Sequence, residues 1–283
     1  MRMDHIVAAV DYSESSYEAA RAAAQLSLRM GADLTLLSVL PDGHPTVPGL
    51  MESSPSLGMQ ERLHSTIVTE FPKLHFKMAM ACGLPPIEIG RFAESRQADL
   101  VVLGRKSRSR ADRLFLGDTA DAVLRRSRIP CMLVPVGRTG VSHVLASLDG
   151  TDRGFMVFEY AAELASHALM TLNALTVDPI WPGETVSLGG DVKSGRAERL
   201  SERIQQRVPH GRRGLGVAAC GTDLLQVRRG DTVTEIAAAI TELNADILVI
   251  GFHRGGPAMM VNGESVSRQL LHVVPSIVIT VPL

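Results

Sequence analysis

The sequence has few cysteines, no excess charge of either sign and no long hydrophobic run. Its three cysteines, Cys82, Cys131 and Cys220, lie far apart without a C-x-x-C pair, which excludes a disulfide-stabilised extracellular scaffold. Lys plus Arg total 29 against 30 Asp plus Glu, so no strong overall field favours nucleic acid or an anionic membrane. With no stretch approaching 18 apolar residues and no apolar signal region at the start, we expect a soluble cytoplasmic protein without membrane attachment.

Motifs of the common enzyme classes are also missing. The sequence contains no G-x4-G-K-[S/T], no G-x-G-x-x-G and no G-x-S-x-G, so a Walker ATPase, a dinucleotide dehydrogenase and a serine hydrolase have no support. The nine histidines are scattered without H-x-x-x-H spacing, so we expect no metal site and interpret His5 and His143 as strand-edge residues. Cys131 lies in a predicted strand and is expected to be a buried apolar residue rather than a reactive thiol.

A long repeat is the main feature that is present. Residues 98–104, ADLVVLG, recur 147 residues later as residues 245–251, ADILVIG. Because this period is too long for a solenoid unit, it predicts a duplicated domain. We place the domains at residues 1–138 and 141–283, and the short linker predicts that they pack as a pseudo-symmetric pair, with a homodimer of the whole chain left open.

Each half alternates aliphatic runs with helical stretches, which predicts an α/β fold with a five-stranded parallel sheet covered by helices on both faces. The Ala-rich helix after Asp11 has a capping-box pattern at Ser15 and Glu18 and a C-cap at Gly31. Two long loops, residues 41–59 and 178–191, are interpreted as surface excursions, with a lid over a site as the alternative. The strands expected in the first half are His5–Val10, Leu34–Val39, His75–Ala81, Leu100–Gly104 and Cys131–Val136.

Ligands of open parallel sheets bind outside the carboxyl ends of the strands. There the first strand ends at Asp11 and the fourth at Gly104, and a basic stretch follows before the helix that begins after Gly117. Glycines permit close backbone approach, and a helix N-terminus offers unsatisfied N–H groups to an anion. This region is therefore the candidate phosphate site; its five cationic residues are Arg105, Lys106, Arg108, Arg110 and Arg113.

Together the V-D-x-S-E start, A-D-L-V-V-L-G, the Gly-Asp-Thr-Ala-Asp-Ala-Val-Leu segment and C-x-L-V-P-V resemble the universal stress protein family over nearly the whole chain, twice. The resemblance implies a nucleotide-binding type of α/β fold whose last strands help to pair domains. It also implies that many members bind ATP through G-x2-G-x9-G-[S/T], while members without the motif do not. By this resemblance Asp11 and Asp149 would face adenosine, and we include Val39 among the candidate cofactor-binding residues.

This chain departs from the ATP motif. In the first half Gly104 and Gly117 match, but Ser107 replaces the second glycine and Asp118 the hydroxyl residue. In the second half Gly251 matches, Arg254 replaces the second glycine, Gly263 comes one residue early and Glu264 replaces the hydroxyl residue. We therefore expect at most one degenerate ATP site, in the first half.

The acid at position 118 has two interpretations. A carboxylate 4 Å from a phosphate charge costs about 4 kcal/mol at an effective dielectric constant near 20, which the cations of the first half could offset, and Thr119 offers a hydroxyl one residue later. Alternatively, Asp118 is simply the helix N-cap, with Asp121 favourable to the helix dipole.

Three function classes remain. The main interpretation is a non-enzymatic stress-response regulator with an unknown protein partner and a possible adenine-nucleotide site. The alternative is a slow nucleotide-hydrolysing enzyme, although no general base is evident. Nucleic-acid binding through the basic stretch and the Arg212–Arg213 pair is weaker, because net charge is near zero and no aromatics are interleaved.

Overall fold

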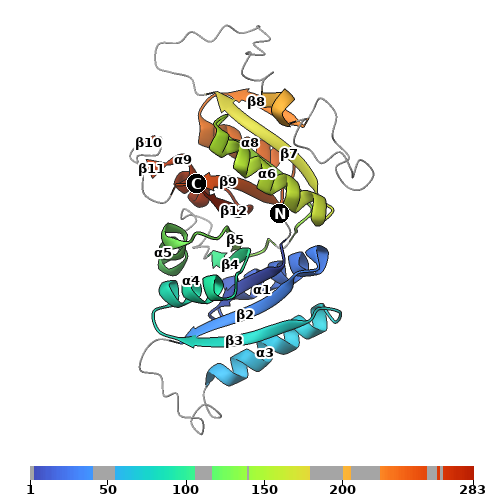
Figure 1. Ribbon diagram of the computed structural model, residues 1–283, viewed down its shortest axis with the longest axis vertical. Coiled ribbons are helices and arrows are strands. Elements are labelled where there is room, and N and C mark those ends of the chain that lie inside the picture. Colours follow the sequence, from blue (N-terminus) through green and yellow to red (C-terminus); the bar gives the residue numbers. More distant parts are fainter. Residues whose placement is uncertain are drawn as a thin grey trace. The chain divides into compact units, whose positions relative to one another are not determined.

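The computed structural model describes residues 3–40, 55–105, 117–138, 140–178, 200–204, 224–253, 260–261 and 264–283 (Figure 1). The chain forms two compact units, residues 2–141 with 277–282, and residues 142–276 with residue 283. Each unit is described by itself, and the pseudo-symmetric packing of the two halves stays a prediction.

The first unit contains the predicted parallel sheet, in the order β3-β2-β1-β4-β5. The final strand of the chain, β12 (Ile277–Pro282), lies antiparallel to β5, with Val278 opposite Leu133. Strand β12 therefore belongs to the sheet of the first unit, next to β5. The five parallel strands are β1 (His5–Val10), β2 (Asp33–Leu40), β3 (Phe76–Cys82), β4 (Leu100–Arg105) and β5 (Cys131–Pro135).

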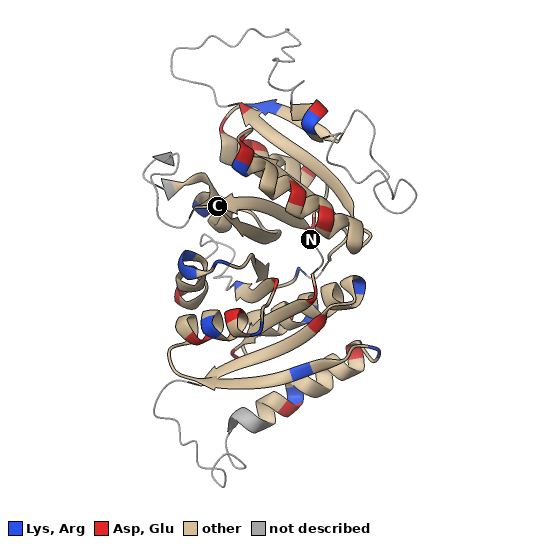
Figure 2. Ribbon diagram, in the orientation of Figure 1, with Lys and Arg blue, Asp and Glu red and all other residues tan. Residues whose placement is uncertain are grey.

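Helices cover this sheet in two pairs: α1 contacts α3, and α4 contacts α5 (Figure 1). Helix α1 packs on β1 and β4, and its five alanines between Ala19 and Ala24 are fully buried, so the helix lies close to the sheet. Charged residues are concentrated on the helices, while the strands are largely uncharged (Figure 2). The helices are α1 (Glu14–Met30), α3 (Pro55–Glu70), α4 (Pro85–Ser95) and α5 (Asp118–Arg126).

Three predicted boundaries in this unit are wrong. Helix α1 begins at Glu14 with Ser13 as its N-cap, so Ser15 and Glu18 lie inside the helix and form no capping box. Helix α3 begins at Pro55, which shortens the predicted loop 41–59. Strand β4 continues through Arg105 instead of ending at Gly104. The C-cap at Gly31 is confirmed: its φ is 67° and its N–H donates to Ser27 O.

The second unit repeats the arrangement with four parallel strands in the order β9-β6-β7-β8. A short antiparallel pair that the sequence did not suggest, β10 (Met260–Val261) and β11 (Glu264–Ser265), precedes the last helix. The strands are β6 (His143–Leu148), β7 (Thr171–Asp178), β8 (Leu225–Arg229) and β9 (Ile247–Phe252), and the helices are α6 (Asp152–His167), α8 (Thr232–Glu242) and α9 (Val266–Val273).

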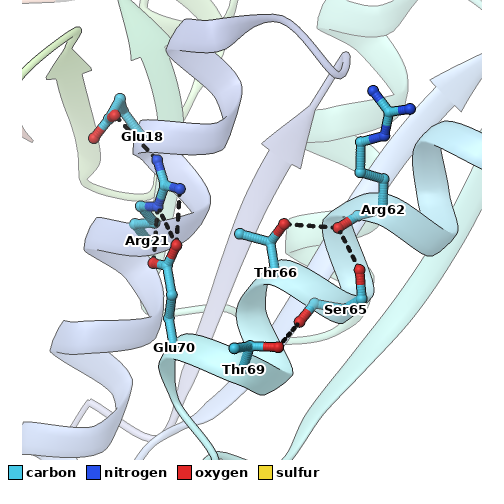
Figure 3. A network of polar contacts seen from close by, with 7 residues as sticks. All are labelled: Glu18, Arg21, Arg62, Ser65, Thr66, Thr69 and Glu70. Atoms are coloured by element: carbon cyan, nitrogen blue, oxygen red, sulfur yellow. Dashed lines mark hydrogen bonds and ion pairs between the residues drawn. The ribbon is translucent and has the colours of Figure 1, made fainter.

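An ion pair fastens α3 to α1. Arg21 of α1 donates to Glu70 of α3 through Nε (2.8 Å) and a terminal nitrogen (2.8 Å), and it also contacts Glu18 (Figure 3). Leu63 and Ile67 of α3 are fully buried. Burial of the two side chains supplies most of the docking energy, because partly exposed ion pairs contribute little.

The second half has a counterpart to this helix that the sequence analysis missed. Residues 200–204 are helical, with Leu200 and Ile204 buried like Leu63 and Ile67. Arg203 donates to Asp152 of α6 (2.8 Å) and stacks on Phe155. The arginine therefore lies on the helix of residues 200–204 and the carboxylate on α6, whereas in the first half the arginine lies on α1 and the carboxylate on α3. A repeated Glu-Arg-Leu at positions 61–63 and 198–200 was the available signal.

The repeated aspartate has the same structural role in both halves. Asp99 Oδ2 accepts hydrogen bonds from the backbone N–H groups of Asp4 (2.7 Å) and His5 (3.0 Å). Asp246 Oδ2 accepts equivalent bonds from Ser142 (2.9 Å) and His143 (3.1 Å). The aspartate of the ADLVVLG motif therefore fixes the start of the neighbouring strand.

The two histidines at these strand starts bond to the adjacent strand. His5 Nε2 lies 2.9 Å from Thr35 Oγ1, and His143 Nε2 lies 2.7 Å from Asn173 Oδ1. His5 Nδ1 lies 3.1 Å from Arg96 O and must donate this bond, because a carbonyl oxygen only accepts. Both histidines are thus bonded within the fold at strand starts, in agreement with their interpretation as strand-edge residues.

Replacement of Asp99 by alanine should lower the free energy of unfolding by about 1–2 kcal/mol, because two backbone donors lose their acceptor. Asp99→Asn, which keeps one side-chain oxygen acceptor, should lose less. Urea denaturation measures both, with exposed Glu94→Ala on α4 as the control expected to change little. Equal stability of Asp99→Ala and the unaltered protein would contradict this role.

Candidate functional site

The carboxyl ends of three strands of the first half lie at one edge of the sheet. Val10 of β1 pairs with Ser38 of β2, and Ala9 pairs with Leu103 of β4. One residue further, the chain presents exposed Asp11 beside half-buried Val39 and Gly104. The predicted candidates Asp11, Val39 and Gly104 therefore come together at the carboxyl edge of the sheet, where ligands of parallel sheets bind.

The carboxylate of Asp11 is held by the turn that follows it. Asp11 Oδ1 accepts from Ser13 N (3.1 Å) and from Ser13 Oγ (2.5 Å). Tyr12, between them, has a positive φ of 60°. This turn reverses the chain so that α1 begins directly above the strand ends, because an aspartate that bonds two residues ahead stabilises a tight turn.

Gly104 permits a backbone contact that no other residue would allow. A Cβ atom on Gly104 would lie 2.5 Å from Ser15 O, 2.6 Å from Ser15 C and 2.9 Å from Ser16 N. The first turn of α1 therefore lies directly against the end of β4. This first motif glycine has a packing reason that is independent of any ligand.

Arg105 is a strand residue and not part of an exposed basic loop, which corrects the sequence-based expectation. It is the last residue of β4, pairs in register with Pro135 and is fully buried. Burial lowers the pKa of its guanidinium to about 10, so the group stays charged at neutral pH. Because side chains alternate along a strand, Arg105 points to the face opposite the one where Gly104 meets α1.

The start of α5 corrects the N-cap interpretation of Asp118. Gly117 is the N-cap, with φ 82° and no side-chain capping bond, and Asp118 is the first helical residue. Asp118 therefore does not cap the helix, although it and Asp121 place negative charge in the first turn, where it favours the helix dipole. Asp118 and Thr119 are both exposed. Ser107 and the other basic-stretch residues, Lys106, Arg108, Arg110 and Arg113, lie outside the described residues.

In the second half the helix start corrects the motif alignment. The N-cap of α9 is Ser265, whose hydroxyl accepts from Arg268 N (3.4 Å). Buried Leu124 of α5 and Leu271 of α9 are 147 residues apart, and the same spacing places Ser265 opposite Asp118. The second half thus has a serine at this position, and Glu264 does not replace it. Arg254 and Gly263 lie outside the described residues.

The space beside Gly251 in the second half is occupied by side chains. A Cβ atom on Gly251 would meet the Leu283 side chain and, at 3.3 Å, Val157 Cγ2. Ser267 Oγ donates to Gly251 O (2.7 Å) and ties α9 to the end of β9. The equivalent of Ser267 in the first half is Ala120, which lacks this bond-forming group. The two strand ends are therefore built differently.

Cys131 agrees with its interpretation as a buried apolar residue. Cys131 is buried, and burial raises the pKa of its thiol to about 12, so it is not a thiolate at neutral pH. Cys82 is exposed, and Cys220 and the Arg212–Arg213 pair lie outside the described residues. Within the described ranges, no cluster of three or more His, Cys, Asp and Glu suits a metal ion. No helix among those same ranges is long and apolar enough to cross a membrane.

Comparison with known proteins decides the family. The model of the universal stress protein family matches twice, over residues 3–135 and 140–282. The chain belongs to this family. A universal stress protein of Methanocaldococcus jannaschii is 36% identical over 62 residues, which cover 22% of this chain and 35% of that protein. The aligned part of this chain thus spans about a third of that curated relative.

Solved universal stress proteins share the fold over almost the whole chain. One from Archaeoglobus fulgidus has a TM-score of 0.73 at 17% identity, covering 99% of this chain and 98% of its own. A putative universal stress protein of Pseudomonas aeruginosa has a TM-score of 0.66 at 14% identity, covering 99% and 93%. At these identities the likeness concerns the fold, which is two tandem universal stress protein domains.

The two motif glycines predict unequal responses to alanine. Gly104→Ala should lower the free energy of unfolding by about 1–3 kcal/mol, because its Cβ would overlap the backbone of α1. Gly251→Ala should be close to neutral, because the overlapping atom is the end of the flexible Leu283 side chain and alanine also restricts the unfolded chain. Denaturant melts of the two variants measure the difference, and equal losses would refute the backbone contact.

Proposed function

We propose that this universal stress protein is a stress-response regulator that binds one adenine nucleotide per chain, at the carboxyl edge of the first half, without turning it over. The observation that carries the proposal is that the carboxyl ends of β1, β2 and β4 lie at one edge of the sheet, which brings Asp11, Val39 and Gly104 together. A carboxylate suits the hydroxyls of a ribose, and a half-buried valine suits the apolar face of a base.

Electrostatics supports phosphate binding in this half. The basic stretch that follows Arg105 supplies four more cations in eight residues, Lys106, Arg108, Arg110 and Arg113. A triphosphate attracts such groups strongly, although the negative charge of Asp118 at the start of α5 repels a phosphate.

The second half offers less to a nucleotide. The carbonyl of Gly251 accepts a hydrogen bond from Ser267 Oγ, and the hydroxyl of Ser265 caps α9. The position of buried Arg105 is taken by Phe252, which carries no charge. We therefore propose that nucleotide binding is confined to the first half.

Titration calorimetry with ATP and Mg²⁺ tests the proposal, and the duplication supplies a matched control. The unaltered chain should bind one ATP, and Asp11→Ala should weaken binding at least tenfold through loss of charged hydrogen bonds to the ligand. Asp149→Ala, the same change in the second half, should leave the affinity unchanged. Absence of heat at millimolar ATP, or equal effects of the two variants, would refute the assignment, and phosphate release above a buffer blank would refute binding without turnover.

Asp118→Ser tests the opposing charge. If a triphosphate lies at the start of α5, this variant should bind ATP about twofold to tenfold more tightly, because an exposed repulsive charge is removed. The gain should shrink at high salt and should be smaller for AMP, whose single phosphate carries less charge. The corresponding change at Asp121, which pairs with Arg125 at 2.8 Å, serves as the comparison, and an unchanged ATP affinity in Asp118→Ser would place the phosphates elsewhere.

A further inference from the structure

A chain of hydroxyl groups links Asp11 to the backbone contact at Gly104. Ser13 Oγ donates its proton to Asp11 Oδ1, and it lies 3.1 Å from Ser15 Oγ. Because a hydroxyl has one proton, Ser15 must donate in the second bond. Ser15 is buried and its carbonyl carbon and oxygen lie against Gly104. The Asp11 carboxylate is thereby connected through two serines to the end of β4.

The second half has the same turn with different bonds. Thr151 N (2.9 Å) and Thr151 Oγ1 (2.7 Å) donate to Asp149 Oδ1, just as Ser13 does to Asp11. However, Thr151 Oγ1 accepts from Gly154 N (3.1 Å) and so caps α6. The position of Ser15 is taken by Arg153, which is exposed.

The two N-cap residues therefore use their hydroxyls differently. Ser13 is the N-cap of α1 but makes no side-chain capping bond, whereas Thr151 caps α6. A missing cap costs a helix about 0.5–2 kcal/mol. Helix α1 therefore lacks this stabilisation at its N-terminus, where the candidate site lies. Departures from a local stability rule are typical of functional positions.

We infer that Ser13 and Ser15 are positioning residues that hold the exposed Asp11 carboxylate in place for ligand binding, and that this serine pair distinguishes the binding half from the second half. The inference rests on the proposed nucleotide site. A carboxylate held in one orientation binds more tightly than a free one, because less side-chain entropy is lost when the ligand arrives.

Four variants of the full chain test the inference by ATP calorimetry and thermal melting. Ser13→Ala should weaken ATP binding roughly fivefold to tenfold, and its melting temperature should fall only through the lost Ser13–Ser15 bond, because no helix cap is lost. Ser13→Thr, which restores the hydroxyl as in the second half, should recover the affinity. Ser15→Ala should weaken binding in the same direction. Thr151→Ala should leave ATP affinity unchanged and lower the melting temperature by about 2–4 °C through the lost cap.

The outcomes separate this inference from the proposed function. ATP binding by the unaltered protein with unchanged affinity in Ser13→Ala would overturn the positioning role and leave the site assignment intact. Failure of Ser13→Thr to recover the affinity would also overturn it. No binding by the unaltered protein would overturn both.

Discussion

The structure of the first half depends on one backbone contact, the close approach of the first turn of α1 to Gly104. This contact fixes the depth at which α1 lies on β4, and the buried alanines of α1 maintain that depth along the helix. It also determines where the turn after β1 must run, and so where Asp11 is placed. Packing and a candidate binding site thus share one constraint, because a side chain at position 104 would displace both.

The fold was largely predictable from the sequence, because buried parallel strands and their crossover helices have strong signatures. The aliphatic runs predicted all five strands of the first half, and the glycine at position 31 predicted the end of α1. Helix starts were less predictable. A capping box and a turn use the same residue types, so the Asp11–Ser13 turn and the Ser15–Glu18 pattern could not be separated without coordinates.

Burial at the candidate site was the part that the sequence could not supply. Arg105 stands among other cations and was assigned to an exposed loop, yet it continues β4 into the core. Similarly, the motif spacing assigned the hydroxyl position of the second half to Glu264, whereas the packing of Leu271 places Ser265 there. Both errors arose because structural positions were assigned from sequence spacing alone. The packing of the core determines which residues occupy these positions.

The duplication shows which features the fold requires and which are free to change. Asp99 and Asp246 keep the same bonds, and Gly83 and Gly230, with φ of 136° and 158°, both face a glutamate of the next helix. Even position 169, which corresponds to Gly31, keeps a left-handed φ of 54° although it is a leucine. Left-handed backbone costs a leucine about 1–2 kcal/mol, so the two halves share this geometry although only the first has the favourable residue. The carboxyl edges share the aspartate turn, because Asp11 and Asp149 accept the same two bonds, and they differ in the groups that follow it: Ser15 corresponds to Arg153, and Ala120 corresponds to Ser267.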